Sequence, residues 1–182
     1  MQCIDSDLSG VIQVKLNRFE DARGWFTETY NAAAFQAIGI PDIFVQDNHS
    51  FSQKGVLRGM HFQYAPHATA KLVRCTRGKI FDVVVDLRAN SPTFLRMVLF
   101  ELAAEDDTLI YIPVGCAHGF YAREDAELQY KVTAHFVKEA DGVFAWNDPA
   151  LAIPWPTKEV ILSDKDRQAP TCADALARGQ VL

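Results

Sequence analysis

The chain contains many short stretches in which hydrophobic and polar residues alternate, separated by turns that contain glycine, proline or asparagine. In the clearest stretch, one face carries Phe81, Val83, Val85 and Leu87, and the other carries Asp82, Val84, Asp86 and Arg88. This two-residue period predicts a β-strand with one buried face. The clearest strand candidates are residues 11–16, 44–46, 71–76, 79–88, 94–102, 108–112 and 127–136. A series of short strands like this is typical of a β-sandwich or β-barrel.

Helical segments are few and short. We expect one over residues 32–38 and another over residues 163–178, where Pro170 interrupts the pattern early. The 182 residues suit one domain with a sizeable core, or at most two small ones. We therefore predict an all-β fold with a few short helices.

The formal net charge of −5 argues against a general nucleic-acid or anionic-membrane binder, although local Arg and Lys side chains can still bind a small anion. The N-terminal residues lack the basic and apolar segments of a signal peptide, and no apolar run reaches the length of a transmembrane helix. We expect a cytoplasmic protein with reduced thiols, because the cysteines have neither metal nor redox spacing. They are Cys3, Cys75, Cys116 and Cys172.

Two of the five histidines lie in segments that suggest chemistry. The segment from Pro113 to His118 resembles the P-x-G-x-x-H half of the cupin pattern. The other half of that pattern needs His-x-His to bind a metal, but here it reads His61-Phe62-Gln63, so we expect a cupin-like barrel without its usual metal. By themselves, these residues leave structural and catalytic roles equally open for His61 and His118. We expect structural roles for His49, His67 and His135.

Other polar residues have simple structural interpretations. Alternation places Tyr130 on the inward face of its strand, where we expect its ring to pack in the core, although its hydroxyl could instead reach a pocket. The residues from Ser163 to Asp166 have the form of a helix capping box, which by itself accounts for Asp166. By default, Arg23, Arg58, Lys71 and Lys165 are surface charges.

Taken in order, short motifs from about residue 10 to residue 170 resemble the dTDP-4-dehydrorhamnose 3,5-epimerase family. They include FVQDNHS at 44–50, GVLRGMHFQ at 55–63, KLVR at 71–74, SPTF at 91–94, AHGF at 117–120, WNDP at 146–149 and LSDKD at 162–166. The resemblance implies a jelly-roll, cupin-like barrel in one domain over residues 1–182, with its core at about 40–137. It also implies a homodimer, no metal or other cofactor, and a nucleotide-diphosphate sugar as substrate.

The resemblance also implies roles for particular residues. His61 would be the base, paired with Asp166, and Tyr130 would be the acid on the opposite face of the sugar. Arg23 and Glu28 would reach the partner barrel on an exchanged N-terminal strand. The implied substrate-binding residues are Arg23, Glu28, Gln46, Asp47, Asn48, Arg58, Lys71, His118, Asp141 and Lys165.

The chemistry agrees with this assignment. Epimerisation beside a ketone needs a base that removes a carbon-bound proton and an acid that returns one from the other face. A carboxylate can fix the tautomer of a histidine base. Lys71 or His118 could stabilise the enolate oxygen, and Arg23, Arg58 and Lys165 could neutralise the diphosphate. Arg58 and His61 would point to opposite faces of a regular strand, so a bulge near Gly59 would be needed.

Three segments depart from the family pattern. Thr69-Ala70 replaces the usual Gln-Gly, residues 135–139 replace a more Tyr-rich segment, and Asp141 replaces a Glu. The substrate could therefore be dTDP-4-dehydro-6-deoxyglucose, epimerised to dTDP-4-dehydrorhamnose, or a close analogue. Alternatives are an epimerase acting at only carbon 3 or carbon 5, a ketoisomerase on another nucleotide sugar, and a sugar-binding cupin without catalysis. A metal-dependent dioxygenase fits least, because the His-x-His pair is missing.

Overall fold

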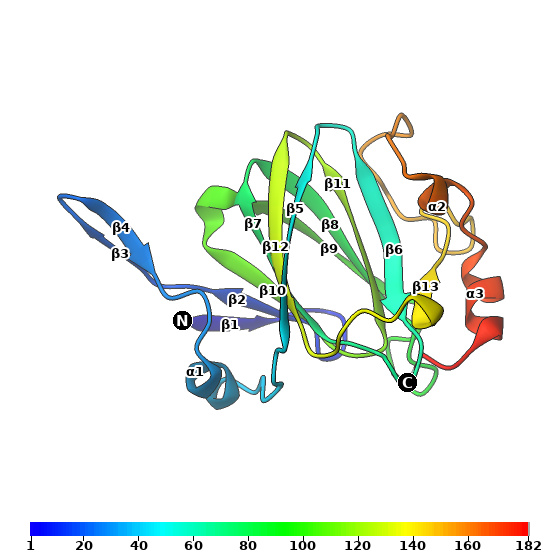
Figure 1. Cartoon of the computed structure of the whole chain (residues 1–182), viewed down its shortest axis with the longest axis horizontal. Coiled ribbons are helices and arrows are strands. Elements are labelled where there is room, and N and C mark those ends of the chain that lie inside the picture. Colours follow the sequence, from blue (N-terminus) through cyan, green and yellow to red (C-terminus); the bar gives the residue numbers. More distant parts are fainter. Residues whose placement is uncertain (182) are drawn as a thin grey trace.

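In the computed structural model, which describes residues 1–181, two antiparallel sheets pack together as an all-β jelly roll (Figure 1). The first sheet has the strand order β1-β2-β10-β7-β12-β5, or Gln2–Asp5, Ile12–Lys15, Thr108–Ile112, Lys71–Arg77, Ala126–Val132 and Gln46–Ser52. The second sheet has the order β13-β6-β11-β8-β9, or Asp141–Val143, Leu57–Gln63, Cys116–Ala122, Lys79–Asp86 and Met97–Ala103. The strands of the two sheets therefore extend beyond the predicted core of residues 40–137.

The remaining elements are short. A separate hairpin joins β3 (Arg18–Asp21) to β4 (Gly24–Thr27). The helices are α1 (Ala32–Ala37), α2 (Asp164–Arg167) and α3 (Cys172–Arg178), and the 3-10 turns are η1 (Ala104–Asp106) and η2 (Lys138–Ala140). Both predicted helical segments are confirmed, including the break before α3. Among residues 1–181, no helix is long and apolar enough to cross a membrane.

Four predicted strands, β2, β7, β8 and β10, agree with the structure to within two residues at each end. The candidate at 44–46 was wrong except for Gln46, where β5 begins. The candidate at 94–102 began too early, because residues before Met97 form a turn in which Leu95 has φ +60. The candidate at 127–136 ran too far, since β12 ends at Val132. Strands β6 and β11 were missed because nearly all of their residues are buried, which removes the alternating pattern.

Strand β8 also differs from the prediction of one buried face, since both of its faces are covered. Val84 belongs to the core between the two sheets, together with residues of β7, β10 and β12. Val83 and Val85 belong to a second core on the outer side of the five-stranded sheet, where the C-terminal segment and α3 cover it (Figure 1). Asp82 and Asp86 therefore lie in the interior rather than on a wet face, and each is 0% exposed.

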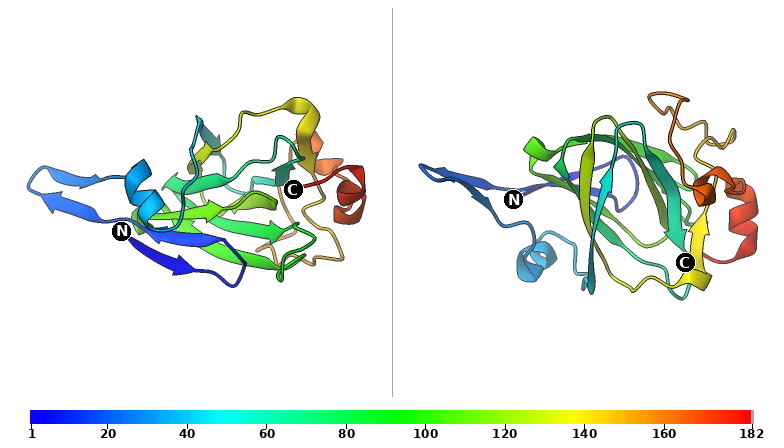
Figure 2. Two further views of the ribbon diagram at one scale, coloured as in Figure 1. Left: turned by 90° about the horizontal axis from the view of Figure 1, so that it is seen from below. Right: turned by 45° about the horizontal axis from the view of Figure 1, so that its top comes forward.

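The β3–β4 hairpin projects away from the two sheets, as the further views also show (Figure 2). It carries three aromatic side chains, Phe19, Trp25 and Phe26, that are 60%, 56% and 65% exposed. The cation of Arg18 lies 4.4 Å from the centroid of the Trp25 ring. Exposed aromatic side chains this close together are typical of a surface that contacts another protein.

Asp86 forms the best-satisfied charged cluster of the interior. Its carboxylate accepts hydrogen bonds from Arg88 Nε at 2.8 Å, Thr93 Oγ1 at 2.6 Å and Ser91 Oγ at 2.5 Å. Burial raises the pKa of Asp86, but these bonds outweigh that effect and lower it to about 2. Because the pKa is lower in the folded state, the carboxylate stabilises the fold above the unfolded pKa of 3.8.

We predict that this stabilisation, worth about 2 kcal/mol, is lost as the pH falls from 4 to 2. Asp86→Asn should lower the free energy of unfolding at pH 7 by about 2 to 4 kcal/mol, because it leaves Arg88 without its buried partner. Glu101→Gln is the matched control, since its ion pair with Arg123 is exposed and should contribute less than about 1 kcal/mol. Urea unfolding at several pH values measures both variants. Equal losses for the two would contradict the prediction.

Candidate active site

A cavity of about 530 Å³ opens between the two sheets, and side chains from both sheets line it. The six-stranded sheet contributes residues of β5, β7 and β12, and the five-stranded sheet contributes residues of β6, β11 and β13. Lys165 of α2 completes one side. The predicted site residues that line this cavity are Gln46, Asn48, Arg58, His61, Lys71, His118, Tyr130, Asp141 and Lys165.

His61 and Asp166 form a closely hydrogen-bonded pair although they are far apart in the sequence. His61 Nε2 lies 2.5 Å from Asp166 Oδ1, and Asp166 is only 3% exposed. Because a carboxylate accepts the proton of Nε2, the lone pair of the neutral ring is on Nδ1. The pair therefore has the arrangement of a base with an orienting acid.

The same carboxylate also bonds the hydroxyl of Ser163, the N-cap of α2. Ser163 Oγ accepts a hydrogen bond from Asp166 N at 3.1 Å and donates one to Asp166 Oδ2 at 2.9 Å. The N-cap role of Ser163 is confirmed, but the reciprocal half of the predicted capping box is not found within residues 163–166, since Asp166 accepts from the hydroxyl of Ser163 and its other oxygen bonds His61. Burial alone would raise the pKa of Asp166, but the hydrogen bonds with His61 and Ser163 outweigh this effect and hold the pKa below its ordinary value.

Burial also sets the protonation state of His61. It lowers the pKa of His61 below its ordinary value, and the hydrogen bond with Asp166 opposes this effect without reversing it. The cations of Lys165 and Lys71 act in the same direction as burial. His61 is therefore neutral near pH 7 and able to accept a proton.

A bulge brings Arg58 and His61 to the same cavity, as predicted. The pairing register between β6 and β11 shifts between His118 and Phe120, so that β6 has one extra residue there. Gly59 occupies the bulge with φ +133, and a Cβ atom at this position would lie 2.6 Å from the Cα of Gly119. Any larger residue would push the two strands apart.

Tyr130 approaches the cavity from the sheet opposite His61. It lies on β12 with its neighbours Leu128 and Val132 on the same side, which confirms the predicted inward face. Burial raises the pKa of Tyr130, and the cation of Arg58 partly offsets this effect. The hydroxyl therefore keeps its proton at physiological pH and can donate it.

Two further groups supply positive charge or polar hydrogens. Lys71 Nζ donates to the backbone oxygen of His61 at 3.2 Å, and burial lowers the pKa of Lys71 to about 8. His118 lies directly across the strand pair from His61, and its Nε2 is 2.7 Å from Asp82 Oδ2. Both side chains therefore face the region between the base and Tyr130.

Polar side chains at the rim are also held in place. Lys165 Nζ lies 2.5 Å from Asp141 Oδ2, and Arg58 donates to Ser52 Oγ at 2.9 Å. Gln46 donates to Asn48 Oδ1 at 2.8 Å. Within residues 1–181 we find no group of three or more His, Cys, Asp or Glu side chains arranged to hold a metal ion.

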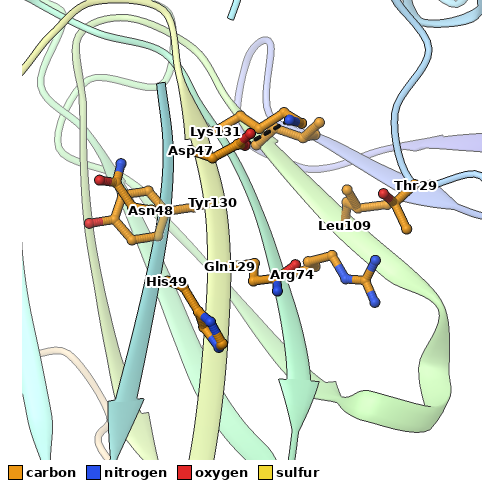
Figure 3. Close-up of a pocket in the computed structure, with 10 residues that line it drawn as sticks. Thr29, Asp47, Asn48, His49, Arg74, Leu109, Gln129, Tyr130 and Lys131 are labelled. Atoms are coloured by element: carbon orange, nitrogen blue, oxygen red, sulfur yellow. Dashed lines mark hydrogen bonds and ion pairs between the residues drawn. The ribbon is translucent and has the colours of Figure 1, made fainter. Parts of the chain in front are cut away.

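Three predicted binding residues lie outside this cavity. Asp47 points to the outer face of the six-stranded sheet, where it pairs with Lys131 at 2.7 Å beside a second hollow of about 380 Å³, whose lining also includes Asn48 and Tyr130 (Figure 3). Arg23 lies in the turn of the projecting hairpin, where it pairs with Asp21, and Glu28 directly follows the hairpin. A single chain does not bring Arg23 and Glu28 to its own cavity.

The structure adds residues that the sequence analysis did not place in the site. Thr69 and Phe136, from the segments that depart from the family pattern, both line the cavity. Thr69 Oγ1 accepts from the backbone nitrogens of Thr133 and Ala134, which holds the end of β12. Asp82 hydrogen-bonds His118 on the side away from the cavity. Its position as an acidic residue within the apolar run of β8 was a signal in the sequence that could have pointed to this role.

The histidines expected to be structural lie at the edge of the site or outside it. His49 faces the outer side and pairs with Glu127 at 3.2 Å. His67 is exposed, and its backbone oxygen accepts from Gln63 at 2.9 Å. His135 is exposed, with Nδ1 3.4 Å from Gln46 Oε1.

Comparison with known proteins gives a consistent result. The family model described as dTDP-4-dehydrorhamnose 3,5-epimerase matches residues 5–174. The Pseudomonas aeruginosa enzyme of that name is 51% identical over 160 residues, which cover 86% of this chain and 88% of that protein. The crystal structure of the Elizabethkingia anophelis enzyme is 42% identical, with a TM-score of 0.91 over 96% of this chain and 97% of that one. A Legionella pneumophila dTDP-6-deoxy-D-glucose-3,5-epimerase, solved in complex with dTDP-4-keto-L-rhamnose, is 40% identical, with a TM-score of 0.89 over 93% and 92%.

We predict that Asp166→Asn lowers the pKa of His61 further, because the carboxylate that favours the imidazolium is lost while burial remains. Titration of the ring signals by NMR measures this value. Asp164→Asn is the matched control, since Asp164 is exposed on the same helical turn and should leave His61 unchanged. A His61 pKa that stays the same or rises in Asp166→Asn would contradict the inferred pairing.

Proposed function

The chain belongs to the dTDP-4-dehydrorhamnose 3,5-epimerase family of isomerases, and we propose that it converts dTDP-4-dehydro-6-deoxyglucose, or a close analogue, to dTDP-4-dehydrorhamnose. The observation that carries this proposal is the placement of the His61–Asp166 pair on one side of the cavity and Tyr130 on the other. Inversion at carbon needs a base and an acid on opposite faces of the sugar ring, and the positions of His61 and Tyr130 on opposite sheets support these two roles.

In the proposed reaction, His61 Nδ1 removes the proton from a carbon next to the ketone. The electrons of the broken C–H bond form a C=C bond, and the carbonyl electrons move to oxygen to give an enolate. Lys71 or His118, which both line the cavity, stabilises the negative oxygen. Tyr130 then donates its proton to the opposite face of the same carbon, which inverts the configuration.

The rim supplies groups that suit a diphosphate. Arg58 and Lys165 are the cations that line the cavity near solvent, and the guanidinium of Arg58 can bind phosphate oxygens in a bidentate manner. Lys165 would exchange its bond with Asp141 for one with the ligand. These local charges explain how a protein of net charge −5 can bind a doubly charged substrate.

A homodimer completes this proposal. The hairpin that carries Arg23 exposes three aromatic side chains, so burial against a second copy would remove apolar surface from water. Arg23 and Glu28 of one chain would then join the cavity of the other, as the family resemblance implies. Asp47 stays a predicted binding residue, although its side chain points away from the cavity.

We predict that His61→Ala abolishes exchange of the sugar ring protons with deuterated water, because no base remains to form the enolate. Tyr130→Phe should still incorporate deuterium, but inversion should slow by roughly a hundred- to ten-thousand-fold. Proton NMR of incubations with the 4-keto-6-deoxy sugar nucleotide follows both events. Exchange at both carbons that flank the ketone indicates a double epimerase, and exchange at one carbon indicates a single epimerase.

The wild-type protein is the reference for this experiment. Migration of the ketone would instead identify a ketoisomerase, and an unchanged substrate would identify a protein that only binds sugars. Normal exchange in His61→Ala would remove His61 from its proposed role. Normal inversion in Tyr130→Phe would return Tyr130 to a packing role.

A second prediction tests the shared site. Sedimentation should give twice the chain mass of 20.3 kDa. Arg23→Ala and His61→Ala should each have low activity alone. When the two variants are dissociated, mixed in equal amounts and allowed to pair again, half of the dimers should contain one chain of each kind, and each mixed dimer should have one intact site out of two. The mixture should therefore recover about a quarter of the wild-type activity. Mixing Tyr130→Phe with His61→Ala is the control and should restore nothing, because both residues belong to the same barrel. An active monomer, or no recovery in the first mixture, would contradict the exchanged hairpin.

A further inference from the structure

Asp82 is a buried charge that the proposed reaction leaves without a role. It lies in the middle of β8, 0% exposed, on the interior face between Ile80 and Val84 of the apolar core. An ionised carboxylate in such surroundings is costly unless cations or hydrogen-bond donors compensate it. The groups that compensate Asp82 therefore indicate what it does.

The first of these groups is His118. Asp82 Oδ2 lies 2.7 Å from His118 Nε2, so the carboxylate holds the proton on Nε2 and leaves Nδ1 for the cavity. This arrangement repeats that of His61 and Asp166 on the neighbouring strand. The second oxygen, Oδ1, is buried and has no hydrogen-bond partner among residues 1–181.

The second group is Lys71. Its Nζ donates one hydrogen bond, to the backbone oxygen of His61, and within the described part of the chain it forms no ion pair. Of the acidic groups that favour its charged form, Asp82 acts most strongly and Asp141 next. Asp141 is already paired with Lys165, so Asp82 is the anion left for Lys71.

The surroundings of Lys71 are mixed in charge. Asp82 of β8 and Asp141 of β13 favour its cation, whereas Lys165 of α2 disfavours it and Cys116 of β11 contributes little. His61, His118, Tyr130 and Arg58 line the same cavity.

We propose that Asp82 is a positioning residue of this site, whose Oδ2 orients His118 and whose charge keeps Lys71 cationic beside the keto oxygen of the substrate. Because no direct ion pair joins Lys71 to Asp82, the remaining hydrogens of Nζ stay free for the developing enolate oxygen. A carboxylate in direct contact would occupy those hydrogens. This inference rests on the proposed function, since it assigns Asp82 a part in the same reaction.

The test is the pH dependence of kcat/KM, which reports the ionisation of essential groups in the free enzyme. We expect the wild-type profile to fall above about pH 8 as Lys71 loses its proton. Lys71→Arg should remove this alkaline limb, because a guanidinium keeps its charge. Asp82→Asn should move the limb to lower pH by about one unit, which corresponds to about a tenfold loss of kcat/KM at alkaline pH.

Two variants separate this effect from a structural one. Asp86→Asn removes another fully buried carboxylate on the same face of β8, about 13 Å along the strand, so it should lose stability without moving the limb. His118→Gln keeps the charge of Asp82, so its rate should fall while its alkaline limb stays near that of the wild type. If Asp82→Asn does not fold, Asp82→Thr is a second neutral variant with a side chain suited to a central strand.

Each result has one meaning. An alkaline limb that stays in place in a folded, neutral Asp82 variant overturns the inference. Failure of both neutral variants to fold, while Asp86→Asn folds, also overturns it, since Asp82 would then be a structural residue. A wild-type protein that converts no keto sugar would overturn the proposed function instead, and the two failures are thereby distinguished.

Discussion

A charge in the apolar interior of a protein needs a partner, and the partners of the buried carboxylates here differ between two regions of the molecule. In one region, the carboxylate of Asp86 accepts hydrogen bonds from Arg88, Ser91 and Thr93, so its charge is compensated by neighbouring side chains. In the other region, Asp82 and Asp166 each hydrogen-bond the Nε2 atom of a histidine that lines the cavity, so that the Nδ1 atom of each ring is free to contact a ligand. Compensation of buried carboxylates thus stabilises the fold around Asp86 and orients the histidines of the candidate site around Asp82 and Asp166.

The cavity depends on both sheets, because each contributes different side chains to its lining. The five-stranded sheet holds His61 and His118 on adjacent strands, and the six-stranded sheet holds Tyr130 and Lys71. An ordinary strand pairing would have turned Arg58 away from the cavity. The bulge at Gly59 prevents this, and the close approach to Gly119 leaves room for no side chain there.

Asp166 shows why a strong local interpretation can be incomplete. The helix start at Ser163 is visible in four consecutive residues, and the structure confirms Ser163 as the N-cap. The hydrogen bond between Asp166 and His61 joins residues that are more than a hundred positions apart, and nothing in residues 163–166 indicates it. Asp82 is a similar case, since the alternation of β8 placed it on a polar face that the second sheet covers.

The all-β class, four of the strands to within two residues and the helical segments could all be predicted from the sequence, and the family motifs pointed to most of the residues that line the cavity. These features depend on local periodicity, on turn residues or on short motifs, all of which can be read from neighbouring positions. Three features became evident only in three dimensions: β8 is buried on both faces, Asp47, Arg23 and Glu28 lie outside the cavity of their own chain, and Asp82 lies behind His118. The physical reason is that burial and charge pairing depend on which strands are neighbours in space, and that order is set by contacts between residues far apart in the chain.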